Sequence, residues 1–107
     1  MIYVLFHWEI KPGCEQSFKE GWTELIHRNI EKHGAIGSRL HKSENNHWLS
    51  YSQWISEAHF NLSQNLQDQH EAARIKMVNA ISKTYPPIVM VPVLDHMVAT
   101  DPAVIHY

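Results

Sequence analysis

Apolar and mixed side chains alternate along the first residues of the chain. The even positions from Ile2 to Ile10 are all apolar, whereas the odd positions are mixed and end in His7 and Glu9. A period of two with β-branched and aromatic residues predicts a strand over residues 2–10. We expect its even face to pack against helices and its odd face to meet a polar-lined cavity or another sheet.

A helical period follows the turn Lys11-Pro12-Gly13. Apolar residues recur there at helical spacing and form one stripe: Phe18, Trp22, Leu25, Ile26 and Ile30. Gly34 is suited to end this helix, because glycine readily adopts the left-handed conformation of a helix C-terminus. The pattern therefore predicts one amphipathic helix ending at Gly34.

Residues 37–42 and 47–55 have strand character, and the pair Asn45-Asn46 supplies the turn between them. Ser56 is a natural N-cap for a second helical segment over residues 57–83, with a break near residues 67–69. Tyr85-Pro86-Pro87 ends that helix. The apolar run 88–98 predicts a fourth strand, at an edge or with a bulge because Pro92 has no N–H to donate.

The predicted order is β-α-β-β-α-β over a single domain of residues 1–107. This order is the ferredoxin-like arrangement, an α+β fold in which helices cover one face of a four-stranded antiparallel sheet. The other face would expose Leu5, Leu49 and Tyr51. A second copy of the same sheet is the simplest cover, so we expect a homodimer.

Composition narrows the function classes. The formal net charge is −2 and no basic cluster occurs, which disfavours nucleic-acid binding. No stretch of about 20 apolar residues is present, so no membrane association is expected. The single cysteine excludes an internal disulfide and fits a reducing compartment. The first residues lack the features of a signal peptide, and we therefore expect a cytoplasmic protein.

Several familiar kinds of site are missing from the sequence. The nine histidines contain no i, i+2 or i, i+4 pair, so no metal site is expected. Cys14 lies at a helix start but has no recognisable base near it in sequence. Phosphate-cradling glycine loops, G-x-S-x-G and C-x-x-C are absent, which disfavours nucleotide-dependent enzymes, serine hydrolases and thioredoxin-like enzymes.

Polar and aromatic residues on the predicted strands are the remaining candidates. His7, His41 and Tyr51 are candidate catalytic residues, each as a base or proton relay, although hydrogen-bonded and inert positions at a sheet edge or interface fit them too. Trp8 and Trp54 are candidate substrate-binding walls, because indoles offer flat surfaces to a planar ligand. Plain core packing is the alternative for both tryptophans.

Two segments together resemble a known family. FHWEIKPGCEQSFKEGW resembles the first strand, Lys-Pro-Gly turn and first helix of antibiotic biosynthesis monooxygenase-like domains. GSRLHKSENNHWLSYSQWISEAHF resembles their second and third strands, ending on the family's strand-end tryptophan, here Trp54. The resemblance implies a dimeric α+β barrel with a pocket in each subunit between sheet and helices. Family members include cofactor-free oxygenases of phenols and quinols, haem-degrading oxygenases and proteins without a known reaction.

The haem-degrading branch receives little support from the sequence. Its asparagine, tryptophan and histidine would fall at Phe6 or His7, near Ser63 and near Ala73, and none of these residues matches. His70 lies close to the expected turn and is a candidate ligand-binding residue.

The resemblance therefore favours a cofactor-independent monooxygenase of a small aromatic substrate, with no cofactor. The alternative is a non-catalytic ligand-binding or stress-response protein with the same barrel. A base that faces a substrate-sized cavity would indicate the enzyme, and a cavity without a base would indicate the binding protein.

Overall fold

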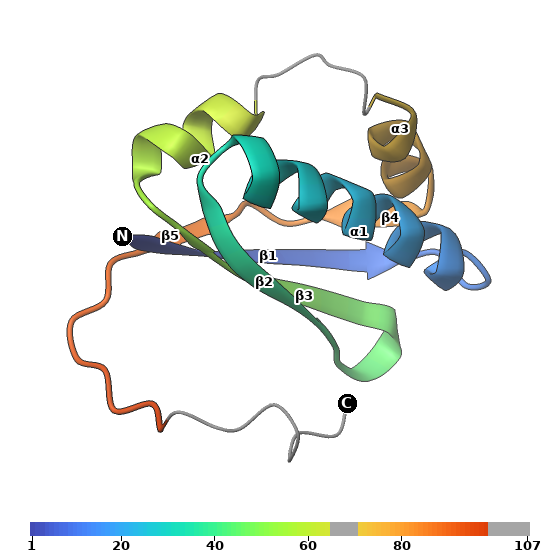
Figure 1. The fold of residues 1–107 in the computed structure, drawn as a ribbon. Coiled ribbons are helices and arrows are strands. Elements are labelled where there is room, and N and C mark those ends of the chain that lie inside the picture. The colour runs from blue at the N-terminus through green and yellow to red at the C-terminus, as the bar shows by residue number, and fades with distance from the viewer. Residues whose placement is uncertain (65–70, 99–107) are drawn as a thin grey trace.

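The structure, a computed structural model, describes residues 1–64 and 71–98. These residues form an antiparallel sheet with three α-helices, which confirms the predicted ferredoxin-like α+β fold (Figure 1). In chain order the elements are β1 (Ile2–Ile10), α1 (Glu15–Lys32), β2 (Ala35–Lys42), the 3-10 turn η1 (Glu44–Asn46), β3 (His47–Trp54), α2 (Glu57–Gln64), α3 (Glu71–Asn79), β4 (Ile81–Thr84) and β5 (Ile88–Met90).

The sheet is built around β1, in the order β2-β3-β1-β4, and every pairing in it is antiparallel. β3 pairs with β1 along nearly its whole length. On the other edge of β1, β4 pairs with Trp8–Ile10 and β5 pairs with Tyr3–Leu5. Two short strands therefore line this edge of β1, whereas the sequence predicts one long fourth strand over residues 88–98.

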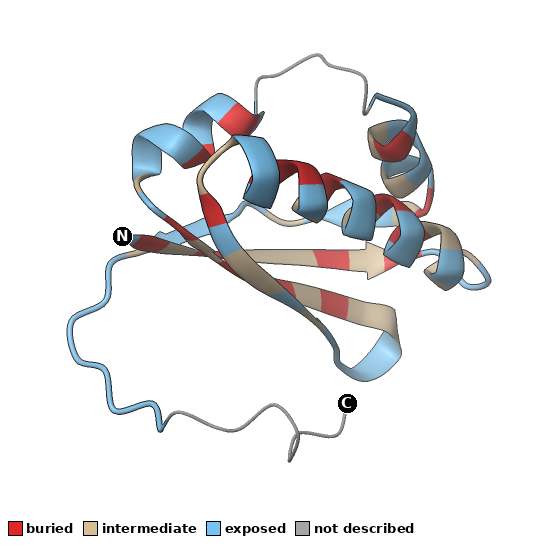
Figure 2. Cartoon of the chain, viewed as in Figure 1, coloured by how far each residue is buried: buried red, intermediate tan, exposed pale blue. Residues whose placement is uncertain are grey.

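The two faces of the sheet differ as the alternation in β1 predicts. Four of its five even residues are buried: Ile2, Val4, Trp8 and Ile10. The odd residues are only half-buried. The helices lie on one side of the sheet, and no described helix covers the other (Figure 1). Figure 2 shows buried residues along α1 and on the strands beneath it. We call the uncovered side the open face.

Local signals in the sequence set the ends of several elements. Gly34 has φ +80° just after α1, in the left-handed region that glycine adopts without strain. Asn45 and Asn46 also have positive φ and turn the chain from β2 into β3. The Ser56 hydroxyl accepts the His59 backbone N–H at 3.2 Å, so Ser56 caps α2 as predicted.

The predicted helix over residues 57–83 is wrong at its C-terminal end. α3 ends at Asn79, and Ile81–Thr84 form β4. Ile81 pairs with Ile10, and the Ser82 hydroxyl donates to the Glu9 carbonyl at 3.0 Å. Pairing with β1 outweighs the weak helical period of this segment. The predicted break at residues 67–69 lies outside the described residues.

The predicted strand over residues 88–98 is also too long, because only Ile88–Met90 pair with β1. Pro92 follows closely and cannot donate to a strand ladder. The apolar residues beyond it are strongly exposed, with Val93 at 90% and Leu94 at 82%. In α1, Ile30 is exposed at 44% and does not belong to the packed stripe.

Replacing Gly34 by alanine is expected to destabilise the chain by about 2–4 kcal/mol. A left-handed backbone costs a non-glycine residue about 1–2 kcal/mol, and a Cβ here would also stand 2.5 Å from the His59 ring. Gly13→Ala is the matched control, because Gly13 has φ +86° with nothing within 4 Å of a Cβ. Urea unfolding of both variants measures the difference, and equal losses would contradict the predicted clash.

Candidate functional site

A cavity of about 270 Å³ lies between the sheet and the helices. Its lining is mostly apolar and includes three of the four tryptophans, Trp8, Trp22 and Trp54. The remaining lining residues are Phe6, Leu25, Ile26, Arg28, Ser50, Ser52, Ser63, Gln64, Arg74, Met77 and Val78. We call this space the indole cavity.

The strands hold two of the indoles firmly. Trp8 is 5% exposed, is stacked on Phe6 at 5.5 Å between ring centres, and meets Phe18 edge-on at 5.1 Å. Trp54 is 1% exposed, and its Nε1 donates to the Ser52 hydroxyl at 3.1 Å. Both residues predicted as walls therefore line one cavity, and both also belong to the packed core.

The helix side of the cavity depends on a close approach between α1 and α3. A Cβ on Gly21 would stand 2.7 Å from the Ala73 carbonyl and 3.0 Å from the Met77 Cβ. Only glycine lets the two helices come this close without a shift. Trp22 follows Gly21 and is half-buried on the cavity wall. Sequence reasoning places Trp22 in the core and misses its position on the cavity.

A buried guanidinium is the strongest polar feature of the lining. Arg28, in α1, is 3% exposed. Its Nε and Nη2 donate to the Asn29 Oδ1 at 3.1 and 2.8 Å, and Nη2 also donates to the Ser63 carbonyl at 3.2 Å. The bond to the Ser63 carbonyl joins α1 to the end of α2. Arg74, in α3, supplies a second guanidinium to the lining, whereas no described lining residue is an Asp, Glu, His, Cys or Tyr.

The structure places the three predicted catalytic residues away from this cavity. His7, His41 and Tyr51 lie on the open face, with His7 and His41 each opposite Leu49, and Tyr51 opposite Leu5. The sheet thus separates them from the indole cavity. Their predicted catalytic role stays a prediction. His70, the other predicted ligand-binding residue, lies outside the described residues.

Tyr51 has its own surroundings on the open face. Its ring is stacked on Tyr3 at 5.2 Å, and both line a second hollow of about 280 Å³ beside residues 90–97. Desolvation raises the pKa of Tyr51 above its ordinary value, and the nearby Tyr3 and Asp95 add to the shift. Tyr51 therefore holds its proton more firmly than a free phenol does.

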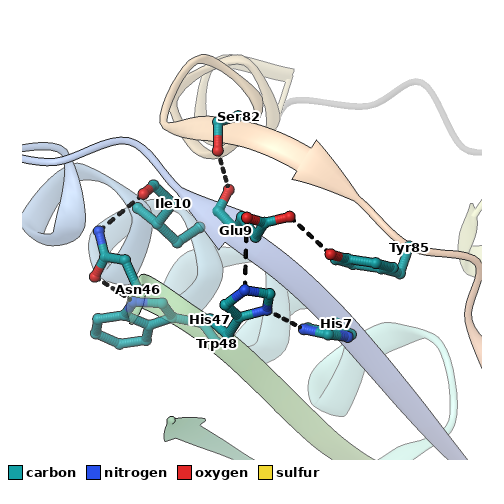
Figure 3. A network of polar contacts seen from close by, with 8 residues as sticks. All are labelled: His7, Glu9, Ile10, Asn46, His47, Trp48, Ser82 and Tyr85. Atoms are coloured by element: carbon teal, nitrogen blue, oxygen red, sulfur yellow. Dashed lines mark hydrogen bonds and ion pairs between the residues drawn. The ribbon is translucent and has the colours of Figure 1, made fainter. Parts of the chain in front are cut away.

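A chain of polar side chains crosses the open face at the other end of β1 (Figure 3). His7 Nε2 and His47 Nδ1 are 2.8 Å apart, and His47 Nε2 is 3.5 Å from the Glu9 carboxylate. The Tyr85 hydroxyl donates to the other Glu9 oxygen at 2.7 Å. Of these four residues, sequence reasoning finds only His7. The register of β1 and β3 brings Glu9 opposite His47, and the sequence alone does not show that register.

Hydrogen bonding shifts the pKa values of two residues in this row of polar side chains, Glu9 and Tyr85. The Tyr85 hydroxyl lowers the pKa of Glu9, helped by the nearby His47, Lys83 and His7 against the opposing effect of desolvation. The same bond is the main cause of the raised pKa of Tyr85. The carboxylate is therefore the form of Glu9 that the network stabilises.

Within the described residues, no group of three or more His, Cys, Asp or Glu side chains is arranged to hold a metal ion. None of the described helices combines the length and the apolar character that crossing a membrane requires.

The model of one protein family matches most of this sequence. The antibiotic biosynthesis monooxygenase family model matches residues 1–75, which include β1, α1, β2, β3 and α2. The chain belongs to this family. Among curated proteins, none matches the sequence.

Solved structures of similar fold support the architecture of this family member. SnoaB from Streptomyces nogalater, a cofactor-independent oxygenase, has a TM-score of 0.73 at 9% identity, over 89% of this chain and 95% of its own. Rv0793 from Mycobacterium tuberculosis has a TM-score of 0.71 at 11% identity, and the match covers 90% of this chain and 98% of Rv0793. A conserved protein from Methanosarcina mazei Go1 has a TM-score of 0.68 at 16% identity, and the match covers 82% of this chain and 88% of that protein. At these identities the likeness shows the fold alone.

Tyr85→Phe is expected to raise the pKa of Glu9 toward its ordinary value, because the variant removes the hydroxyl donor. A lowered carboxyl pKa stabilises the fold above the unfolded value, and this stability is lost as pH falls through the folded value. The variant should therefore be less stable than the parent at pH 6, with a smaller difference at pH 3. Carboxyl NMR titration and urea unfolding measure both effects, and an unchanged Glu9 titration would contradict the assignment.

Proposed function

We propose that this protein is a cofactor-independent monooxygenase that binds a small phenol- or quinol-type substrate in the indole cavity and works as a homodimer. The supporting observation is the cavity itself, which three indoles line in a chain of the antibiotic biosynthesis monooxygenase family. Indoles offer flat apolar surfaces on which an aromatic ring can stack. Burial between sheet and helices would also keep water from a reactive intermediate.

The size of the cavity favours a small substrate. Ligand pockets in proteins commonly have volumes of about 300–1,000 Å³, and the indole cavity has about 270 Å³. This volume suits one or two fused rings better than a larger polycyclic molecule. 1-Naphthol is therefore a suitable probe, because it is a two-ring phenol with an unsubstituted carbon para to its hydroxyl.

The cationic side chains of the lining can donate hydrogen bonds to an ionised phenol. Arg28 and Arg74 bring two guanidinium groups to the cavity, and no carboxylate from the described residues lines it. Nearby positive charge favours the phenolate over the phenol. The ring anion supplies the electrons that reduce dioxygen, one oxygen atom adds to the ring, and the other leaves as water. For 1-naphthol and one O₂, the balanced products are 1,4-naphthoquinone and one water.

A binding protein is the second candidate, and one observation favours it. No side chain that titrates near neutral pH belongs to the described lining. On our primary proposal the substrate oxygen accepts a hydrogen bond from a guanidinium of the lining as it ionises, and the proton passes to solvent. On the alternative, the cavity holds its aromatic ligand without any reaction.

Oxygen consumption with 1-naphthol separates the two candidates. With metal-free protein and ¹⁸O₂, we expect one labelled oxygen in each 1,4-naphthoquinone and one O₂ consumed per product. Binding seen by tryptophan quenching without O₂ uptake would favour the binding protein. Neither binding nor turnover of 1-naphthol would contradict the proposed substrate class.

Variants on the two faces of the sheet test the place of the reaction. Trp22→Phe keeps a ring on the cavity wall but reduces its stacking surface, so we expect binding of 1-naphthol to weaken by about fivefold, or about 1 kcal/mol. Tyr51→Phe removes the phenol predicted as a relay on the open face. A loss of turnover with Tyr51→Phe and none with Trp22→Phe would move the site to the open face.

The homodimer is proposed from the open face, where Tyr3, Leu5 and Leu49 are only half-buried and Tyr51 and Ile88 are exposed. Sedimentation should report about 25 kDa, twice the chain mass of 12.5 kDa. Leu5→Glu should give a monomer, because it would bury a charge between two sheets. Leu62→Glu is the control, since Leu62 is 65% exposed on α2. A parent chain that sediments as a monomer at micromolar concentration would contradict the proposal.

A further inference from the structure

The polar chain on the open face has a defined order of donors and acceptors. Glu9, as a carboxylate, accepts from Tyr85 and faces His47 Nε2, so His47 is best arranged with its proton on that nitrogen. His47 Nδ1 then has a lone pair and accepts from His7 Nε2–H at 2.8 Å. Two neutral imidazoles thus satisfy each other through one shared proton.

The polar chain on the open face connects three segments that are distant in sequence. His7 and Glu9 lie in β1, His47 begins β3, and Tyr85 follows β4. The His7 and Tyr85 rings are stacked at 4.0 Å with only 9° between their planes, and the Tyr85 backbone N–H donates to the His7 carbonyl at 3.0 Å. The imidazole pair therefore lies at the junction between β1, β3 and the segment that joins β4 to β5 (Figure 3).

The pair accepts one additional proton but not two. With one added proton, an imidazolium donates to the remaining neutral ring, and the bond between the rings is kept. With two added protons, both facing nitrogens carry N–H groups, and two donors would stand 2.8 Å apart with no acceptor between them. Like charge adds to this repulsion, so the rings must separate.

The surrounding charges do not remove this conflict. Glu9 on β1 is the carboxylate that faces His47, with 3.5 Å between its oxygen and His47 Nε2. Lys83 on β4 lies over the Tyr85 ring at 4.6 Å and brings further positive charge. Leu49 on β3 lies between His7 on β1 and His41 on β2. A positive charge on His41 would therefore add to the repulsion within the pair and would not relieve it.

We propose that the His7–His47 pair is an acid-sensitive latch that closes this end of the open face near neutral pH and releases the Tyr85 segment when both imidazoles are protonated. The homodimer of the proposed function would cover the same face. Resting on that proposal, we further infer that acid weakens association of the two copies.

The sign of the effect follows from the proton count. In the open form the two rings have separated, and the pair holds two added protons. In the closed form the bond between the rings is kept, and the pair holds at most one added proton. Ordinary imidazoles titrate near pH 6.5. Below that pH the ratio of the open form to a closed form that holds one proton fewer rises about tenfold for each pH unit. The closed form is therefore favoured at neutral pH and weakens about thirtyfold relative to the open form as pH falls from 6.5 to 5. The low pKa of Glu9 keeps its carboxylate charged over this range.

Hydrogen exchange of the Tyr85 amide tests the latch without reference to turnover or dimerisation. After correction for intrinsic exchange, we expect its protection to fall about tenfold per pH unit below about pH 6.5. His47→Gln should abolish this fall, because an amide oxygen can accept from His7 and takes up no proton. His27→Gln is the matched control on the exposed side of α1 and should behave as the parent does. Equal pH dependence in the parent and in His47→Gln would overturn the proposal.

Ring-nitrogen NMR of the parent protein gives a second measurement if His47→Gln does not fold. We expect Tyr85 amide protection to be lost only where the ring nitrogens show that both His7 and His47 carry charge. Charge on both rings with unchanged protection would overturn the latch. Sedimentation at pH 7 and pH 5 then tests association of the two copies. A dimer at both pH values contradicts only the inference that acid weakens association. A monomer at both pH values contradicts the homodimer and leaves the exchange result on the latch unaffected.

Discussion

The pairing of β1 with β3 is the constraint on which both candidate sites depend. Antiparallel pairing sends successive side chains to opposite sides of the sheet. Phe6 and Trp8 consequently reach the indole cavity, while His7 and Glu9, their sequence neighbours, lie on the open face. A slip of one residue in this register would exchange the two surfaces. The buried even face of β1 opposes such a slip.

The indole cavity combines apolar walls with buried positive charge. Burial of a charge is costly unless hydrogen bonds compensate it, and Arg28 meets this requirement through Asn29 and the Ser63 carbonyl. The bond to the Ser63 carbonyl also connects α2 to α1 at the edge of the cavity. Gly21 sets the approach of α3 from the other side. The geometry that would bind an aromatic anion is therefore part of what holds the three helices together.

The sequence predicts the elements whose signals are local. The period of two in β1, the positive φ at Gly34 and the cap at Ser56 all depend on near neighbours, and the structure confirms each of them. The strand Ile81–Thr84 has only a weak local signal, since it is defined by distant residues of β1. The structure places Trp8 and Trp54 on one cavity, and their predicted substrate-binding role stays a prediction, whereas Trp22 is missed because its stripe fits simple core packing as well.

The polar chain shows why spacing alone could not group the candidate residues. His7 and His47 are 40 positions apart, and Tyr85 reaches Glu9 only because the segment after β4 returns to β1. The alternation in β1 already places His7 and Trp8 on opposite faces, so one site holding both conflicts with the predicted strand. The structure follows the strand, and the five predicted site residues that it describes are divided between the two faces of the sheet.

The indole N–H signals in an NMR titration with 1-naphthol test most directly whether the ligand enters the cavity between sheet and helices. We expect the indole N–H signals of Trp8, Trp22 and Trp54 to shift on saturation with 1-naphthol. Trp48, which is buried but does not line the cavity and donates to Asn46, should stay nearly unchanged. Shifts confined to the rings of Tyr3 and Tyr51, with the cavity indoles unaffected, would place the ligand on the open face and contradict the account.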